Sequence, residues 1–276
     1  MALQQHKQDW EELGISQKKR FMKKSPSTIR FVTPKILSNT RLSQTTRRFV
    51  KAHPLTRLTI LALVLHASHQ LHQGMNILDV GAGDSPYKSL FSHVEYKSTD
   101  FAQTDYHAFQ EIDYICPADA IPVSEKSFDA ILCTEVLEHV PHPQNVLTEF
   151  HRVLKQSGHL FVTTPLLYPL HEEPYDFYRY TLYALKQLLQ EAGFEVVFLT
   201  SRGGWVATVA STLGWDIRRP SRENVLAYGL FFLPLFALPI LLMRFIPTRM
   251  LAWLDKTLDK EQNYTLGYAF HAIKVD

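Results

Sequence analysis

Cysteine is scarce in this sequence, and its scarcity excludes two classes of small protein. The 276 residues contain two cysteines, Cys116 and Cys133. A single widely separated pair provides neither a disulfide framework nor the ligand spacing of a structural zinc site. The first residues also lack the apolar stretch that a secretory signal peptide requires. These absences predict a protein of a reducing compartment, the cytoplasm, that is made without a cleaved leader.

Net charge is also small, at +2, but it is distributed unevenly. Residues 1–57 contain 13 Lys or Arg and 3 Asp or Glu, whereas the rest of the chain contains 16 and 24. This asymmetry predicts a basic N-terminal arm, residues 1–52, attached to an acidic body. The arm is expected to be solvated and partly disordered, or to be attracted to an anionic membrane surface. Its few aromatic residues make nucleic-acid binding the weaker alternative.

A long apolar run stands out near the C-terminus. Residues 225–243 form 19 consecutive positions without a charge, close to the ~20 residues of a spanning helix. Pro234 and Pro239 interrupt the run, and arginines flank it on both sides. This pattern favours a bent, re-entrant or in-plane membrane element over a full span. A buried helical hairpin or a dimer contact is the alternative.

The centre of the sequence is a short apolar run that ends in a glycine turn. Residues 76–80 have the composition of a buried parallel strand. Gly81 and Gly83 allow a sharp turn and a close approach to a ligand, because they have no Cβ. Asp84 and Ser85 then provide helix-capping side chains. A strand, a glycine turn and a helix start together indicate a nucleotide-like ligand.

Strand and helix patterns alternate along the rest of the chain. Helices are expected at 55–72, 143–154 and 182–192, and strands at 76–80, 94–99, 130–133, 159–164, 195–201 and 264–275. This alternation predicts an α/β protein with parallel strand pairing. Asp100 ends the second strand about 20 residues beyond the glycine turn, where a carboxylate accepts the ribose hydroxyls of a nucleotide.

Four motifs in order resemble class I S-adenosylmethionine-dependent methyltransferases. They occupy residues 77–83, 127–131, 135–140 and 152–160. The resemblance implies a Rossmann-like, seven-stranded mixed sheet with an antiparallel last strand, flanked by helices. A dehydrogenase is the rival Rossmann-like interpretation, but it would have a glycine where this chain has Pro86.

The resemblance also divides the chain. Residues 53–204 and 262–276 would form the methyltransferase domain, and residues 205–261 would form a hydrophobic insert before the last strand.

S-adenosylmethionine is the cofactor that the resemblance implies. Gly81 and Gly83 would pass under its methionine part, Asp79 would hold its ammonium and Asp100 its ribose. The loop at Asp119 and Ala120 would face the adenine. The complete set of cofactor candidates is Asp79, Gly81, Gly83, Asp100, Asp119, Ala120 and Glu135. The third glycine of the family's motif is replaced by Ser85.

The loop at residues 169–181 is dense in His, Tyr, Arg and carboxylate side chains. It follows a strand at the sheet edge where α/β proteins bind ligands. An alcohol acceptor needs a base to take its proton, and the candidates are His171, Asp176 and His139. The acceptor-binding candidates are Tyr175, Tyr178 and Arg179. Alternatively, Asp176 and Arg179 form a salt bridge, Phe177 packs and Thr181 caps the next helix; the alternative is favoured for Phe177 and Thr181.

A metal site is a further possibility, although none is the main expectation. Glu135, Glu138 and His139 resemble the residues with which quinone-biosynthetic O-methyltransferases hold a divalent metal, and carboxylates with an imidazole are suitable ligands. Without a metal, Glu138 would act as a cap and His139 would line the pocket.

The sequence therefore predicts a methyltransferase that methylates an oxygen of a lipid-linked, amphiphilic or glycan acceptor at the inner face of a membrane. Two alternatives stay open. One is a soluble small-molecule O- or N-methyltransferase in which the insert is a lid or dimer surface. The other is a membrane scaffold that binds the cofactor without turnover.

Overall fold

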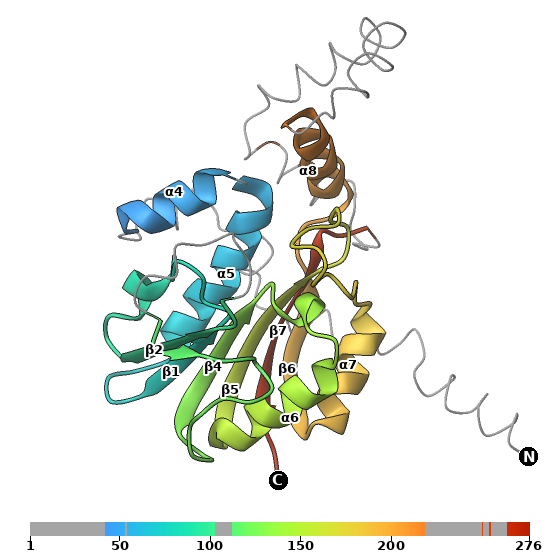
Figure 1. The fold of residues 1–276 in the computed structure, drawn as a ribbon. Helices are drawn as coiled ribbons and strands as arrows, with labels where there is room; N and C mark the ends of the chain where they lie inside the picture. Colours follow the sequence, from blue (N-terminus) through green and yellow to red (C-terminus); the bar gives the residue numbers. More distant parts are fainter. Residues whose placement is uncertain (1–41, 53, 103–111, 219–249, 251–253, 255–263) are drawn as a thin grey trace, which may run out of the picture.

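The computed structural model describes residues 42–52, 54–102, 112–218, 250, 254 and 264–276. These residues build one sheet of seven strands in the order β3-β2-β1-β4-β5-β7-β6, with helices on both faces (Figure 1). The strands are β1 Asn76–Val80, β2 Glu95–Asp100, β3 Tyr114–Ile115, β4 Phe128–Thr134, β5 Leu154–Pro165, β6 Phe194–Ser201 and β7 Gly267–Lys274.

Among the described strands, β7 alone runs in the opposite direction to the other six. It pairs antiparallel with β5 and β6, while the pairs β3–β2, β2–β1, β1–β4 and β4–β5 are parallel. The predicted seven-stranded mixed sheet with an antiparallel last strand is therefore confirmed. Because parallel strands end on the same side, the carboxyl ends of β1, β2 and β4 share one edge of the sheet.

Helices bury both faces of the sheet. They are α4 Gln44–Ala52, α5 Pro54–Gln70, α6 Pro143–Val153, α7 Leu182–Glu191 and α8 Trp205–Arg218, with short 3₁₀ helices η1 Lys88–Phe91 and η2 Leu137–His139. One core lies between the sheet and α6 and α7, and a second lies between the sheet and α5. With both faces covered, strands such as β1 have consecutive buried residues instead of alternating ones.

Three local features differ from the expectations. Part of the stretch expected to be an arm forms α4, whose Thr46 is fully buried and donates a hydrogen bond to the Pro86 carbonyl at 2.7 Å. A stretch expected to be loop contains β3. The glycine turn leads into turns and η1 rather than into an α-helix, and Ser85 takes a left-handed φ of 47°. Ser85 thus keeps the backbone conformation that a glycine would favour.

The basic residues 1–41 and the apolar run 225–243 lie outside the described residues. Within the described part of the chain, every helix is too short or too polar to cross a bilayer. Membrane contact of the apolar run therefore stays a prediction.

Three histidines form a chain of rings between α5 and the sheet. His271 on β7 hydrogen-bonds through one nitrogen to His159 at 2.9 Å and through the other to His66 at 3.4 Å. Its ring also stacks on Phe161. Burial, followed by the two neighbouring imidazoles, lowers the pKa of His271 to about 3. The folded protein therefore holds this ring neutral.

This buried ring predicts acid sensitivity. The unfolded chain protonates His271 near its ordinary pKa of 6.5, so its contribution to stability is complete above that pH and is lost as the pH falls from 6.5 towards 3. At pH 5 the loss is about 2 kcal/mol. The drop in melting temperature between pH 7 and pH 5, followed by circular dichroism, should be smaller in His271→Gln than in wild type. The exposed His72→Gln is the control, and equal drops in all three proteins would contradict the prediction.

Candidate active site

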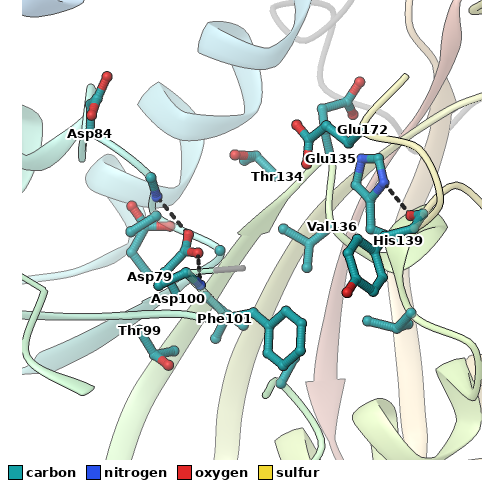
Figure 2. Close-up of a pocket in the computed structure, with 18 of the residues that line it drawn as sticks. Asp79, Asp84, Thr99, Asp100, Phe101, Thr134, Glu135, Val136, His139 and Glu172 are labelled. Carbon is teal, nitrogen blue, oxygen red and sulfur yellow. Dashed lines mark hydrogen bonds between the residues drawn. The ribbon is translucent and has the colours of Figure 1, made fainter. Parts of the chain in front are cut away.

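A cavity of about 730 Å³ lies at the carboxyl edge of the parallel strands. One side is formed by the ends of β1 and β2 and by residues 116–119. The rest of the lining comes from residues after β4, from the loop after β5, and from α4 and the start of α5. Figure 2 shows Asp79, Asp84 and Asp100 on one side of this cavity, and Glu135, His139 and Glu172 on the other.

The glycine turn leaves no room for side chains at the cavity floor. Gly81 and Gly83 have φ values of 68° and 50°, which L-residues with a Cβ rarely adopt. A Cβ on Gly81 would also collide with Cγ2 of Val136. The Gly81 amide donates to the Thr99 carbonyl at 2.8 Å, which ties the turn to β2. The sequence prediction of a close backbone approach here has a structural basis.

Asp100 fixes this turn from the end of β2. Its two carboxylate oxygens accept hydrogen bonds from the amides of Gly83 and Ala102, both at 2.9 Å (Figure 2). Each oxygen retains lone-pair capacity, because an ionised carboxylate accepts about four hydrogen bonds. Asp100 also lines the cavity, so it can accept from a ligand while it holds the turn.

Asp79 is a buried acid at the end of β1. Burial raises its pKa to about 7, although the hydroxyl of Tyr96 donates to it and opposes the shift; the nearby Asp100 adds to it. A cationic group arriving in the cavity would therefore meet a carboxyl that ionises near neutral pH. This is a suitable partner for an ammonium.

The two residues expected to face the adenine lie differently relative to the cavity. Asp119 lines the cavity together with Cys116 and Ala118, whereas Ala120 is exposed and does not line it.

Several cavity residues come from segments for which the sequence predicted no site role. Phe49 of α4 packs edge-on against Tyr87 at 5.5 Å, and Arg57 of α5 stacks over Phe49 at 3.7 Å. The Tyr87 hydroxyl is buried without a hydrogen-bond partner among the described residues. Since buried hydroxyls are normally paired, this hydroxyl can bond a polar group of a ligand in the cavity. The sequence carried no signal for these residues beyond a helical pattern.

Two histidines line the opposite side of the cavity. His139 Nδ1 bonds the Tyr175 carbonyl at 2.7 Å, and His171 Nδ1 bonds the Pro169 carbonyl at 3.2 Å. A carbonyl can only accept, so each Nδ1 carries a proton, and in the neutral form of either ring Nε2 is the unprotonated nitrogen. The rings lie 4.6 Å apart. Burial, and then His139, lower the pKa of His171.

Asp176 and Arg179 form the salt bridge that the sequence left as an alternative. Two bonds of 2.6 and 2.7 Å join them, and the carboxylate also accepts the His171 amide at 3.0 Å. Burial raises the pKa of Asp176, but Arg179 and this amide outweigh it and lower the pKa to about 2. Asp176 and Arg179 do not line the cavity, so the pair orients His171 and its loop.

The remaining loop residues divide between the cavity and the exterior. Tyr175 lines the cavity, whereas Tyr178 does not and donates its hydroxyl to the Pro141 carbonyl at 2.9 Å. Phe177 was expected to be a packing residue, but it lines the cavity and is 45% exposed. Thr181 caps α7 through its hydroxyl, as predicted.

The residues that could hold a metal differ from the predicted set. Glu138, His139 and His171 bring three ligand atoms within 4.8 Å of one another. Both oxygens of the fully buried Glu138 lack a hydrogen-bond partner among the described residues, although one lies 3.8 Å from His139 Nε2, and burial and the nearby Glu135 raise the pKa of Glu138. Glu135 itself bonds the buried Arg202 at 2.8 Å. His171 therefore replaces Glu135 among the three possible metal ligands, because the loop after β5 folds back over η2.

Comparison with known proteins identifies the class. Residues 52–199, more than half of the chain, match the family described as methyltransferase domain. The chain belongs to this family, the S-adenosylmethionine-dependent methyltransferases. The motifs that suggested this class are confirmed, and the dehydrogenase alternative is not supported.

Two curated relatives bear the same name. Ubiquinone biosynthesis O-methyltransferase from Vibrio atlanticus is 28% identical over 103 residues, which cover 33% of this chain and 44% of the relative. The Chromobacterium violaceum protein of the same name is 30% identical over 125 residues, covering 40% and 53%. The chain thus spans about half the length of the curated relatives it matches.

Solved structures agree on the fold. A Galdieria sulphuraria protein provisionally assigned as a sarcosine dimethylglycine methyltransferase has a TM-score of 0.51 at 16% identity. The match covers 85% of this chain and 99% of the other. At this identity the similarity concerns the fold alone.

The residues present fit S-adenosylmethionine. The cavity combines a floor without side chains at Gly81, an acid at Asp79 for an ammonium and an acid at Asp100 for hydroxyls. The unpartnered Tyr87 hydroxyl offers one further polar contact.

The glycine floor makes a direct prediction. Gly81→Ala should weaken the binding of S-adenosylhomocysteine, measured by calorimetry, by about tenfold or more, because the methyl group must displace Val136. Gly74→Ala is a matched control: its φ is 92°, but nothing lies within 4 Å of the added Cβ. An unchanged affinity in Gly81→Ala would contradict the prediction, and an equal loss of affinity in both variants would assign the effect to backbone strain instead of cavity shape.

Proposed function

We propose that the protein transfers the methyl group of S-adenosylmethionine to a hydroxyl oxygen of a small or amphiphilic acceptor, with His171 as the base. The observation that carries the proposal is that His171 bonds a carbonyl through Nδ1, which leaves Nε2 for the acceptor's proton, and that it lines the same cavity as the glycine turn. The name of the curated relatives, O-methyltransferase, supports oxygen as the accepting atom.

The protein's part in this reaction is placement and proton transfer. The cofactor, when bound, supplies a methyl group on a sulfonium, which is already a strong electrophile. The glycine turn, Asp79 and Asp100 hold it on one side of the cavity, while the aromatic residues opposite exclude water and orient the acceptor. The acceptor's proton passes to His171 Nε2 as the new carbon–oxygen bond forms. His139 is the second candidate for this task.

His171 predicts a pH profile and a loss of turnover. Because its pKa is lowered, kcat should rise with pH through a value below 6.5 and then stay level. His171→Ala should lower kcat by about 100-fold or more, with little change in S-adenosylhomocysteine affinity. The exposed His142→Ala is the control. Full activity of His171→Ala on the true acceptor would assign the loop a structural role.

The lining of the cavity supports an acceptor with an apolar or aromatic part. Phe49, Phe101, Tyr168, Tyr175 and Phe177 all line it. Aromatic walls give large contact areas and prefer flat or apolar groups. Labelled S-adenosylmethionine incubated with lipid, quinone-precursor and glycan extracts should yield a labelled product that is stable to mild base. Label in the aqueous amine fraction only would favour the N-methyltransferase alternative.

A lipid-linked acceptor at the inner face of a membrane is the more specific form of the proposal. Its support is the apolar run 225–243 and the exposed Trp205 and Tyr264, which lie on either side of that run in the sequence. Such aromatic residues prefer the membrane–water interface. A soluble enzyme with the insert as a lid or dimer surface, or a scaffold without turnover, are the alternatives.

Liposome flotation tests this form. Replacing residues 225–243 with a short polar bridge should release the protein from vesicles at every salt concentration. Deleting residues 1–41 should weaken binding only at low salt, since salt screens charge beyond a Debye length of about 10 Å at 0.1 M. Wild-type protein that stays in the aqueous fraction would favour the soluble alternative.

A further inference from the structure

α4 has two faces with different chemistry. Its inner face places Thr46 and Phe49 against the segment that follows the glycine turn. Its outer face exposes Arg47, Arg48 and Lys51. The helix contains no acidic residue. Figure 1 shows α4 covering the end of α5, at the sheet edge from which α8 also projects.

The inner face forms part of the cofactor cavity. Phe49 lines the cavity, and its carbonyl accepts a hydrogen bond of 2.6 Å from Arg57, which also lines it. Thr46 bonds the carbonyl of Pro86, another lining residue. The position of α4 therefore decides the shape of the cavity beside the glycine turn.

α4 depends on contacts outside itself. Nine residues are too few for a helix that is stable alone in water. Its N-terminal cap comes from its own segment: the Oγ of Ser43 accepts a hydrogen bond from the Thr46 amide at 3.1 Å. The contacts with the rest of the fold come from the three buried or half-buried side chains Thr46, Phe49 and Val50. An element with so few anchoring side chains is readily stabilised by a partner on its outer face.

We propose that the outer face of α4 docks on an anionic lipid bilayer, and that docking closes the cofactor cavity and raises cofactor affinity. The inference deepens the membrane form of the proposed function and rests on it. Its electrostatic part is charge complementarity between three exposed cations and anionic lipid. The choice of a bilayer comes from the sequence: residues 219–249, which contain the apolar run, follow directly after α8 in the chain.

Coupling between two binding sites is reciprocal, so the effect of vesicle docking can be measured as a change in cofactor affinity. In calorimetry on the full chain, vesicles with 30 mol% phosphatidylserine should raise S-adenosylhomocysteine affinity by about fivefold or more. Pure phosphatidylcholine vesicles should give little change. Arg48→Gln/Lys51→Gln should lose the increase and keep the affinity measured without vesicles. Lys126→Gln/Lys186→Gln removes the same charge far from α4 and should behave as wild type.

Three outcomes would overturn the inference. The first is a vesicle-induced rise in S-adenosylhomocysteine affinity that survives in Arg48→Gln/Lys51→Gln. The second is an equal rise in affinity with phosphatidylcholine vesicles, and the third is no rise in affinity with any vesicles. An equal increase with RNA in place of vesicles would assign the face to a soluble polyanion instead. Absence of S-adenosylhomocysteine binding under every condition would refute the proposed function itself, which separates the two failures.

Discussion

The site depends on the parallel pairing of β1 with β2 and β4. This pairing brings Val80, Asp100 and Thr134 to one edge of the sheet. The chain can then turn at Gly81 with its amide on the Thr99 carbonyl, while Val136 occupies the space that a side chain on Gly81 would need. The cavity floor at the glycine turn is thus shaped by backbone geometry, since Gly81 and Gly83 contribute only backbone atoms.

Charge is placed differently on the two sides of the cavity. On the cofactor side, Asp79 is buried and ionises near neutral pH, whereas Asp100 is engaged by backbone amides. On the acceptor side, Glu135 and Asp176 are each paired with an arginine, which leaves Glu138 and two imidazoles facing one another. Arg202 and Arg179 thus hold these two acids in ion pairs, and burial lowers the pKa of His171, which favours its neutral form.

The strands and the glycine turn of the cofactor side could be predicted from the sequence, because they depend on local patterns. The apolar run before Gly81 and the acid 17 residues after Gly83 specify a strand, a turn and a second strand. Other features have no local signal. The apolar residues of α5 are distributed around the whole helix, so its sequence cannot show that Arg57 turns towards the cavity. Glu135 and Arg202 are 67 residues apart, and only the folded sheet brings them together. Likewise, only the path of the loop after β5 shows that His171, and not Glu135, joins Glu138 and His139.

The central claim is that this cavity is built for S-adenosylmethionine. Its most direct test is a calorimetric titration of the full chain with S-adenosylhomocysteine and, separately, with NAD. The account predicts saturable one-to-one binding of S-adenosylhomocysteine, with weaker binding in Asp100→Ala, and no binding of NAD. Binding of NAD with no response to S-adenosylhomocysteine would contradict it.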